Sequence, residues 1–315
     1  MSAAFARAGA VVTVGTFDGV HRGHWELLQT VVQRAHEQDR PSVLVTFDPH
    51  PLRIVRPDAA PRLLTTPVEK MEILAESGLN YAAFLRFDRK LSTYEPRRFV
   101  EEILIGRFGL AHLIIGYDHG FGRGRSGDVE TLQLLGRELG FGVEVVGPVA
   151  ADEAPISSTR IRRALVDGDV VAAAAGLGRA YSLRGTVVRG DGRGRQLGFP
   201  TANIEVPDAE KLLPAEGIYA VRAVLREGTI DGVLHLGPRP TFAGATASVE
   251  AFLLDWSGDL YGRHVRIDFC SRLRGVERFE NAAALIRAME ADVEAARALF
   301  RGGAGACGIP PIPLA

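Results

Sequence analysis

Short apolar runs alternate with amphipathic helical segments through roughly the first 140 residues of the chain. The apolar runs predict strands at residues 11–14, 43–47, 112–115 and 143–146. Helical spacing, or a proline in a first turn, predicts helices at residues 25–35, 67–77, 96–108 and 129–139. This alternation predicts a parallel sheet with helices on both faces. Ligands of such sheets bind at the carboxyl ends of the strands, which is where a site is expected.

The pattern changes near residue 180, after helical stretches at residues 159–166 and 170–175. From Tyr181 onward, glycine and proline turn signals separate short β-like runs, which is typical of a small antiparallel barrel. A last helix is predicted from about Asn281 to Phe300. We therefore expect an α/β domain followed by a β domain that ends in a helix. The expected boundaries are 9–168 for the first domain, 169–181 for a linker, 182–301 for the second domain and 302–315 for a loose tail.

Composition excludes several classes of protein. Lysine and arginine total 37 against 38 acidic residues, so a net charge of −1 offers no general attraction for nucleic acid or an acidic membrane. Cys270 and Cys307 are too few for a disulfide framework or a four-thiolate zinc site. No apolar run reaches the roughly 18 residues of a membrane span, and the first nine residues are not a secretory signal, so we expect a soluble cytoplasmic protein. None of the lysines, Lys70, Lys90 and Lys211, follows a glycine, which excludes a P-loop NTPase.

A loop rich in glycine and histidine, residues 15–24 (GTFDGVHRGH), joins the first predicted strand to the first predicted helix. Glycines let the backbone approach a ligand, and a helix N-terminus offers unpaired N–H groups and positive potential to phosphate. His21 and His24 are three residues apart, so both can face that site and donate to phosphate oxygens. A tight turn with two solvated histidines is one alternative. A metal pair is another, although no third ligand is obvious nearby. We predict phosphate binding.

A second cluster, residues 156–162 (ISSTRIR), places three hydroxyls and two arginines where a helix is predicted to begin. Each hydroxyl could be an ordinary N-cap, with the arginines on an exposed helix face. Hydroxyls and arginines at a helix start also bind phosphate. Together with the first loop, the cluster predicts a second part of one phosphate site.

Residues 122–127 spell Gly-x-Gly-x-x-Gly, and Glu144 follows about 20 residues on, as in dinucleotide-binding dehydrogenases. That fingerprint should turn directly off its strand, whereas about six residues separate this one from Ile115. It also leaves the histidine loop unexplained. A glycine-rich surface loop without a ligand is the remaining structural alternative.

Residues 185–203 of the second half are dense in glycine and arginine. A flexible loop of this kind can fold over the phosphates of a nucleotide. Thr201 and Asn203 lie on one side of a predicted strand, so both side-chain oxygens can reach one Mg²⁺. A hairpin for the glycines and a turn at a strand edge for Pro-Thr-Ala-Asn are the structural alternatives.

These motifs together resemble the prokaryotic bifunctional riboflavin kinase/FAD synthetase family. The first loop and the Ile-Ser-Ser-Thr cluster are similar to the adenylyltransferase module of that family, which belongs to the nucleotidylyltransferase superfamily. Residues 46–51 (TFDPHP) match its Thr-Phe-x-Pro-His-Pro box. Residues 115–118, 121–122 and 125–128 match its flavin-side loop. His119 stands where the family has an aromatic residue, which puts the flavin packing in question but not the nucleotide site.

The second half resembles the riboflavin kinase module. Residues 194–203 (GRQLGFPTAN) carry its signature, and four further motifs follow in the order of the family at residues 211–219, 237–242, 249–255 and 259–262. Residues 233–237 (VLHLG) depart from the usual Ala-Asn-Ile-Gly. The resemblance spans about residues 11–300 and implies a Rossmann-like nucleotidylyltransferase domain followed by a riboflavin kinase barrel.

The resemblance also implies roles for particular residues. Glu250 would be the catalytic base of the kinase, and Thr201 and Asn203 would bind Mg²⁺ with the nucleotide phosphates. In the kinase, ATP and flavin would contact Gly190, Gly192, Arg193, Gly194, Arg195, Gly198, Pro200, Tyr219 and Arg239. In the adenylyltransferase, the candidates for ATP and phosphate are Gly15, Phe17, Asp18, Gly19, His21, Gly23, His24, Ser157, Ser158, Thr159, Arg160 and Arg162. The candidates on the flavin side are Asp48, His50, Asp118, Phe121 and Arg125.

Two reactions are implied: riboflavin and ATP give FMN and ADP, and FMN and ATP then give FAD and pyrophosphate. A neutral ribityl hydroxyl gains from a base such as Glu250. An FMN phosphate oxygen is already anionic, so the histidines and arginines only hold anions and stabilise charge. Three alternatives remain, and the intact motifs of both halves argue against each of them. They are a nucleotidylyltransferase for another precursor, a kinase with a vestigial first half, and a flavin-binding regulatory protein without turnover.

Overall fold

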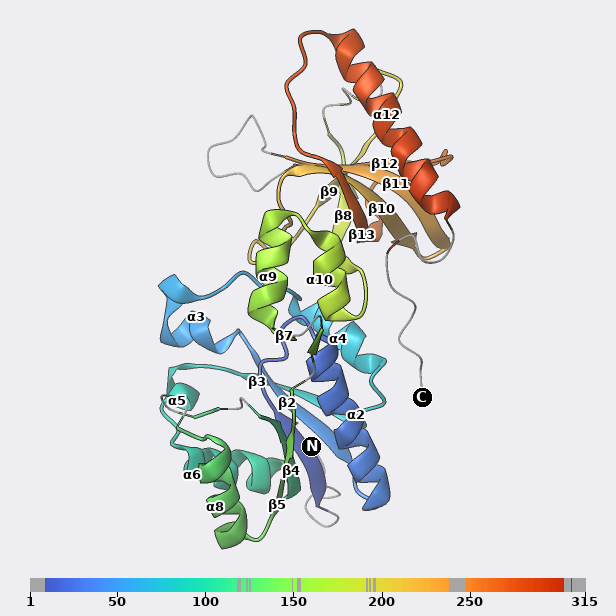
Figure 1. Ribbon diagram of the computed structural model, residues 1–315. Coiled ribbons are helices and arrows are strands. Elements are labelled where there is room, and N and C mark those ends of the chain that lie inside the picture. Colours follow the sequence, from blue (N-terminus) through green and yellow to red (C-terminus); the bar gives the residue numbers. More distant parts are fainter. Residues whose placement is uncertain are drawn as a thin grey trace. The chain divides into compact units, whose positions relative to one another are not determined.

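A computed structural model describes the fold of the chain (Figure 1). It describes residues 9–117, 120–122, 124, 126–148, 150, 151, 154–190, 192, 194, 197–237, 248–302 and 307. The chain forms two compact units, residues 1–156 and 157–315. Among the described residues, no helix is both long and apolar enough to cross a membrane.

The first unit is built on a five-stranded parallel sheet in the order β3-β2-β1-β4-β5. Central β1 is buried at every residue, as an apolar run predicts for a strand covered on both faces. This sheet confirms the predicted α/β class. Its strands are β1 (Ala10–Val14), β2 (Ser42–Asp48), β3 (Tyr81–Arg86), β4 (Leu110–Gly116) and β5 (Gly142–Val146).

Helices cover both faces of this sheet, and each face has its own apolar core. Leu28 and Val31 of α2 (Arg22–Glu37) and Leu74 of α4 (Pro67–Ala75) pack on one face. The other face is covered by α8 (Val129–Leu139) and by the helical run α6 (Pro96–Phe99), η2 (Val100–Ile105) and α7 (Gly106–Phe108). Short elements complete the unit: α3 (Pro51–Val55), η1 (Pro57–Ala59), α5 (Arg89–Ser92), β6 (Ala150–Ala151) and β7 (Ala154–Pro155).

The edge strand β3 has no counterpart among the strands expected from the sequence. Its burial pattern shows why, because none of its six residues is buried. An exposed edge strand lacks the alternation that predicts a half-buried one. The helix expected at residues 96–108 is present, with a π-helical turn at η2 in its middle.

The second unit contains a closed antiparallel barrel in the order β10-β11-β12-β9-β8-β13, which confirms the predicted β domain. Tyr181, Tyr219 and Phe269 pack together inside it, with Phe269 between the two tyrosines. Its strands are β8 (Tyr181–Val188), β9 (Ala202–Glu205), β10 (Gly217–Leu225), β11 (Gly228–Gly237), β12 (Ser248–Leu253) and β13 (His264–Arg274).

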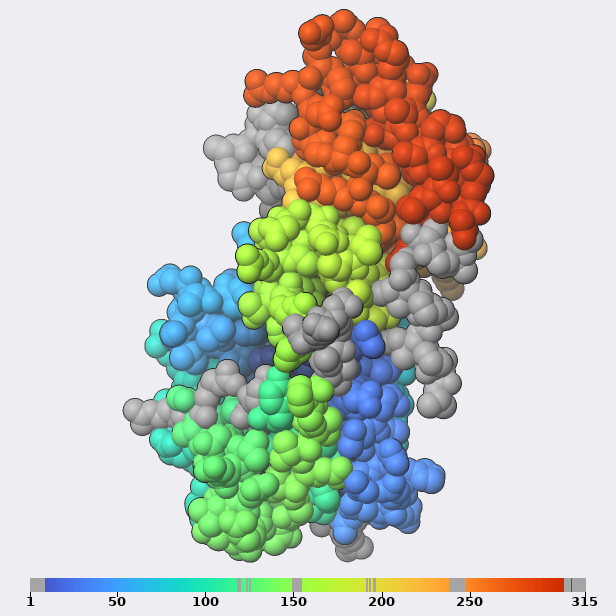
Figure 2. Space-filling model, viewed as in Figure 1, coloured from blue at the N-terminus to red at the C-terminus, as the bar shows by residue number. Residues whose placement is uncertain are grey.

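Three helices belong to the barrel unit. The last, α12 (Ala282–Arg301), packs Ala296 against Ala220 and Leu254 and forms part of the outer surface, in red (Figure 2). The others, α9 (Ser158–Asp167) and α10 (Val170–Leu177), pack on each other, and α10 also contacts β8 and β13. The range in which the sequence predicts a linker, 169–181, therefore contains a helix packed on the barrel.

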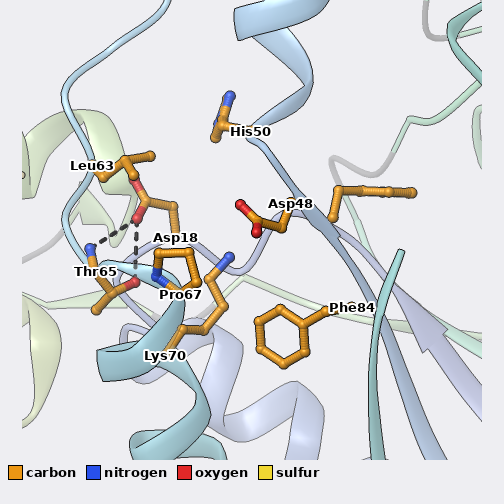
Figure 3. Close-up of a pocket in the computed structure, with 9 residues that line it drawn as sticks. Asp18, Asp48, His50, Leu63, Thr65, Pro67, Lys70 and Phe84 are labelled. Carbon is orange, nitrogen blue, oxygen red and sulfur yellow. Dashed lines mark hydrogen bonds between the residues drawn. The ribbon is translucent and has the colours of Figure 1, made fainter. Parts of the chain in front are cut away.

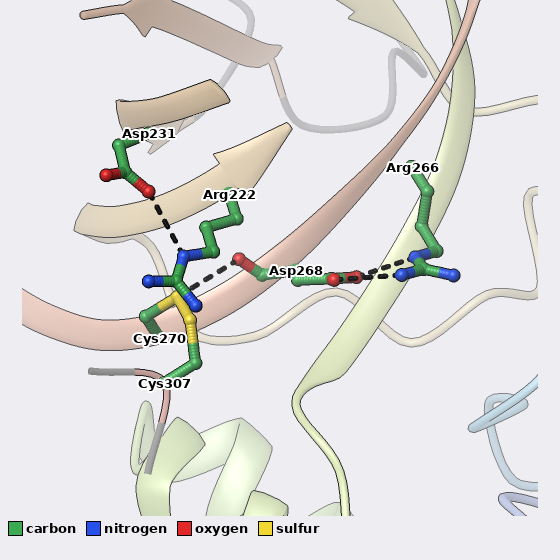
Figure 4. The surroundings of a disulfide bond; sticks show 6 residues. All are labelled: Arg222, Asp231, Arg266, Asp268, Cys270 and Cys307. Atoms are coloured by element: carbon green, nitrogen blue, oxygen red, sulfur yellow. Dashed lines mark hydrogen bonds and ion pairs between the residues drawn. A yellow bond between two sulfur atoms is a disulfide. The ribbon is translucent and has the colours of Figure 1, made fainter. Parts of the chain in front are cut away.

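A disulfide joins Cys270 of β13 to Cys307, and their Cα atoms lie 4.0 Å apart (Figure 4). Cys307 lies in the range expected to be a loose tail, so the chain is covalently attached to the barrel at this position. The two cysteines do not form a framework of several disulfides. They form one crosslink, which closes a loop that contains α12. The spacing of two cysteines in a sequence does not show whether they meet.

Candidate functional site

The histidine loop lies at the carboxyl end of β1, where the order of the parallel sheet reverses. The chain leaves β1 for β2 on one side and returns to β4 on the other. A reversal of this kind opens a crevice outside the carboxyl ends of the two strands, and α/β proteins bind ligands there. The loop is therefore placed where the sequence analysis expects a site.

His21 and His24 adopt one fixed arrangement at the start of α2. His21 is the N-cap of the helix, and its Nδ1 accepts a hydrogen bond from the backbone N–H of His24 at 3.3 Å. The two rings stack with centroids 3.7 Å apart, and Phe17 packs against His24 at 4.7 Å. Because Nδ1 of His21 accepts, the proton of a neutral ring is on Nε2, which is then a donor. The first turn holds no acidic residue, so its N–H groups keep their attraction for an anion.

Asp18 holds the loop to the segment that precedes α4. Its buried carboxylate accepts hydrogen bonds from the backbone N–H groups of Leu64 and Thr65, at 3.0 Å for each. The N–H of Gly19 donates to Thr65 Oγ1, also at 3.0 Å. These contacts favour a role for Asp18 in fixing the loop, since a carboxylate would repel phosphate.

A small pocket beside the loop brings together Asp18, Asp48 and His50, three predicted site residues (Figure 3). Asp48 ends β2, and His50 caps α3 by accepting from the N–H of Leu52. Six further residues line the pocket that the sequence analysis does not assign to a site: Phe47, Leu63, Thr65, Pro67, Lys70 and Phe84.

The flavin-side loop after β4 is only partly described. Phe121 is buried and packs on Phe99 at 4.9 Å, so its ring belongs to the core of the first unit. This packing favours a structural role for the ring. Asp118, His119 and Arg125 lie outside the described residues.

The hydroxyl cluster begins α9, which groups with the second unit. Ser157 is its N-cap and accepts from the N–H of Arg160 at 3.3 Å, as the ordinary capping alternative predicts. Ile161 and Leu165 are buried on the other side of the helix. A contact between this helix start and the histidine loop stays a prediction, as do the roles of Ser158, Thr159 and Arg162.

In the barrel, the adjacent strands β12 and β9 place Glu250, Asn203 and Thr201, the residue just before β9, together. Glu250 on β12 lies directly opposite Asn203 on β9 in the strand register. Its Oε2 accepts a hydrogen bond from Thr201 Oγ1 at 3.5 Å, and its Oε1 accepts from Ser248 Oγ at 2.8 Å. On its other side Glu250 is opposite His235 of β11. Ser248 and His235 are neighbours that the sequence analysis does not assign to the site.

The glycines before β9 lie directly against these side chains. A Cβ on Gly190 would fall 2.0 Å from Asn203 Nδ2, and one on Gly194 would fall 2.3 Å from the carbonyl oxygen of Phe199 and 3.2 Å from Thr201 Oγ1. No residue larger than glycine fits at either position without displacing its neighbour. Gly190 and Gly194 therefore lie directly against Asn203 and Thr201. Gly198, with a φ of +88°, lies at the turn that leads into Pro200.

Mg²⁺ suits the donors present here, because hydroxyl and amide oxygens are the hard ligands it prefers. It also keeps several waters and binds substrate phosphates, so two protein ligands suffice. Across the described part of the chain, no group of three His, Cys, Asp or Glu side chains could form an all-protein metal site. The His-x-x-His metal alternative therefore gains no further ligand of these kinds from the described residues.

Tyr219 lies apart from this group. It is fully buried inside the barrel, where its hydroxyl donates to the carbonyl of Ala215 and burial raises its pKa. Gly192 is exposed in the glycine loop. The predicted arginines Arg193, Arg195 and Arg239 lie outside the described residues.

The sequence contains one indication that Lys70, which lines the pocket, is a buried lysine. Lys70 and Leu74 are four residues apart on α4, so they share the buried face of that helix. A lysine on an apolar helix face needs a buried partner. The partners of Lys70 come from distant segments, so the sequence alone does not reveal them.

Comparison with known proteins covers both units. A family model of FAD synthetase matches residues 4–160, and one of riboflavin kinase matches residues 177–300. The chain is 38% identical over 293 residues to the bifunctional riboflavin kinase/FMN adenylyltransferase of Escherichia coli K12, covering 93% of each chain. The Bacillus subtilis protein of the same name is 32% identical, again with 93% of each covered.

A solved structure shares the fold. The crystal structure titled macrolide-efflux protein from Streptococcus pneumoniae aligns with a TM-score of 0.84 and 30% identity, covering 92% of this chain and 94% of that one. Both domains, in this order, and nearly the full length of the relatives are therefore matched. The chain belongs to the bifunctional riboflavin kinase/FMN adenylyltransferase family.

Proposed function

We propose that this chain makes FAD from riboflavin in two steps, each with ATP as the second substrate. The barrel unit converts riboflavin and ATP to FMN and ADP, and the first unit converts FMN and ATP to FAD and pyrophosphate. One observation carries the proposal: the carboxylate of Glu250 lies opposite Asn203 and accepts from Thr201, so a base and two oxygen ligands for a cation lie side by side.

The barrel site suits transfer of the terminal phosphoryl group of ATP. The oxygen of a ribityl hydroxyl bonds to that phosphorus while the bond to ADP breaks, and the hydroxyl proton goes to the Glu250 carboxylate. Ser248 and Thr201 hold the carboxylate in one orientation by donating to its two oxygens. Because Thr201 donates its hydroxyl proton to Glu250, its oxygen lone pairs stay available to a cation. Mg²⁺ bound by Thr201 and Asn203 would neutralise phosphate charge.

The first unit suits transfer of an adenylyl group. A phosphate oxygen of FMN bonds to the α-phosphorus of ATP while the bond to pyrophosphate breaks, and no proton needs a base. Charge develops on the α-phosphate and on the leaving pyrophosphate, so the site must supply donors. His21 Nε2 and the start of α2 supply them in a fixed geometry. That Ser157, Ser158, Thr159, Arg160 and Arg162 also hold the phosphates stays a prediction from the sequence.

The test is direct. The chain is incubated with riboflavin, ATP and Mg²⁺, and the flavins are resolved by chromatography over time. The proposal predicts that FMN forms first and FAD follows, whereas no product forms without ATP. A nucleotidylyltransferase for another precursor would leave riboflavin unchanged, a vestigial first half would stop at FMN, and a regulatory protein would bind flavin without converting it. A cytoplasmic location stays a prediction from the sequence.

A further inference from the structure

Lys70 ties helix α4 to the main chain of the histidine loop. Its side chain is only 7% exposed, and Nζ donates to the carbonyl oxygen of Thr16 at 2.7 Å. The same carbonyl accepts from Thr46 Oγ1 of β2 at 3.0 Å. The loop bends sharply after Thr16, since Phe17 has a φ of +47°, and it then leads to His21. Lys70 thus fixes the main chain at the point where this bend begins.

The segment that leads into α4 holds the same loop at further points. The backbone of Leu64 and Thr65 donates to Asp18, and Thr65 Oγ1 accepts from Gly19. Lys70 follows on the first turns of α4, after a capping box formed by Thr66 and Glu69. A rigid helix start therefore sets where the ammonium group lies.

The amino group of Lys70 points into the pocket between Asp18 and Asp48 (Figure 3). Burial lowers the pKa of Lys70, whereas the charges of Asp18 and Asp48 act to raise it. A buried charge reduces stability unless it is paired, so an apolar residue would cost less at this position of the helix. Two carboxylates beside a site for two anionic substrates are also unfavourable unless a cation compensates them.

Building on the proposed function, we propose that Lys70 is a positioning residue for adenylyl transfer. Its ammonium group holds the histidine loop through Thr16, and it offsets the negative charge of Asp18 and Asp48. The loop then presents the two histidines and the start of α2 in one geometry to the triphosphate. Lys70 acts through these groups, so it affects the rate of transfer more than the binding of ATP or FMN.

The test is Lys70→Met, which keeps the aliphatic stem and removes the charge and the donor. We expect kcat for the conversion of FMN to FAD to fall about 100-fold, because misplacing reacting groups by about 1 Å costs that much. The KM values for FMN and ATP should stay within about threefold. Lys90→Met is the matched control, because Lys90 is an exposed lysine of the same unit, and this variant should retain full activity. Riboflavin phosphorylation by the barrel should be unchanged in both variants.

Lys70→Arg is the second variant, because it keeps a charge and an N–H donor. It should recover at least about tenfold of the rate that Lys70→Met loses, as partial restoration of the loop predicts. Circular dichroism shows whether Lys70→Met unfolds the first unit. If it does, kcat for the conversion of FMN to FAD is compared between Lys70→Arg and the unmodified chain. We then expect kcat of Lys70→Arg to be lower by no more than about tenfold.

Three results would overturn the inference: full kcat in folded Lys70→Met, a loss confined to KM, or a folded Lys70→Arg that is as slow as Lys70→Met. Where Lys70→Met unfolds, a folded Lys70→Arg about 100-fold slower than the unmodified chain would overturn it as well. Failure of the proposed function itself would give a result that none of these variants is needed to see. In that case the unmodified chain would make no FAD from FMN and ATP.

Discussion

Glu250 and Asn203 face each other across β12 and β9, one residue directly opposite the other in the antiparallel register. Opposite residues in such a pair share one face of the sheet, with Cβ atoms about 4.5–5.5 Å apart. A carboxylate and an amide oxygen are therefore adjacent on the barrel surface. The carboxylate can take a proton while the amide and the nearby Thr201 hold a cation with the phosphates.

Replacing Glu250 with glutamine keeps the shape of the side chain and removes its basicity. We expect FMN formation to fall roughly 10²–10⁴-fold, because a general base contributes that much to a transfer of this kind. Conversion of supplied FMN to FAD should hardly change. Glu227→Gln is the control, since Glu227 is an exposed partner of Arg263 in the hairpin between β10 and β11 and should retain full kinase activity. A folded Glu250→Gln with normal kinase activity would show that Glu250 is not the base.

Gly190→Ala tests whether the cation ligands include Asn203, against which Gly190 lies. Its methyl group would fall 2.0 Å from Asn203 Nδ2, so the loop or Asn203 must move. We expect riboflavin phosphorylation to fall at least about tenfold and to need a higher Mg²⁺ concentration for half-maximal rate. Gly275→Ala is the control, because its methyl group would meet only Arg272 Nη2 at 3.9 Å. An unchanged Mg²⁺ dependence in Gly190→Ala would contradict the placement of the site.

The barrel unit should work alone only when α9 and α10 stay attached. These helices bury Ile161, Leu165, Val170 and Leu177. We expect a fragment of residues 157–315 to fold and to phosphorylate riboflavin without making FAD. A fragment of residues 180–315 loses this packing, and burial of each such side chain stabilises by about 1.5–3 kcal/mol. It should therefore have a clearly lower Tm, and equal Tm values for the two fragments would contradict the packing described here.

His112 gives the first unit a predicted pH dependence of stability. Burial lowers the pKa of His112. The positive charges of Arg34 and Arg40 lower this pKa further, whereas the negative charge of Glu144 acts to raise it. The folded state therefore binds the proton less tightly than the unfolded chain, whose histidines titrate near about 6.5. The free energy of unfolding should therefore keep its full value above about pH 6.5 and decrease as the pH falls below it.

Urea titrations of the full chain and of His112→Gln, between about pH 5 and 8, measure this effect. The variant should lose part of the decrease seen below about pH 6.5 in the transition of the first unit. Identical pH profiles for the two proteins would contradict the prediction.

The sequence predicts most of the fold because its signals are local. Buried strands such as β1 are apolar throughout, and Pro67 marks a helix start at the residue where α4 begins. Edge strand β3 is missed because its side chains are not buried. The packing of α10 on β8 and β13 depends on contacts between distant residues, which periodicity does not report.

Some residues of the candidate sites can likewise be predicted from local motifs, whereas others depend on contacts between distant residues. The histidine loop and the Thr201, Asn203 and Glu250 set are recognisable as motifs, and the structure places each set in one region. The role of Lys70 is not recognisable, because the Thr16 carbonyl to which it donates is 54 positions away in the sequence. Tyr219 belongs to a motif that resembles the kinase family, yet its ring packs in the barrel core.

Two separate sites on one chain should lose their activities independently of each other. Both half-reactions are measured in Glu250→Gln and in a His21→Asn/His24→Ala double variant, where asparagine preserves the N-cap of α2. Losing donors at a site of developing charge costs about 10²–10³-fold, so the histidine variant should lose FAD formation at least about 100-fold and still make FMN. Glu250→Gln should show the reverse pattern. Loss of both activities in either folded variant, or retention of FAD synthesis by the histidine variant, would contradict the claim.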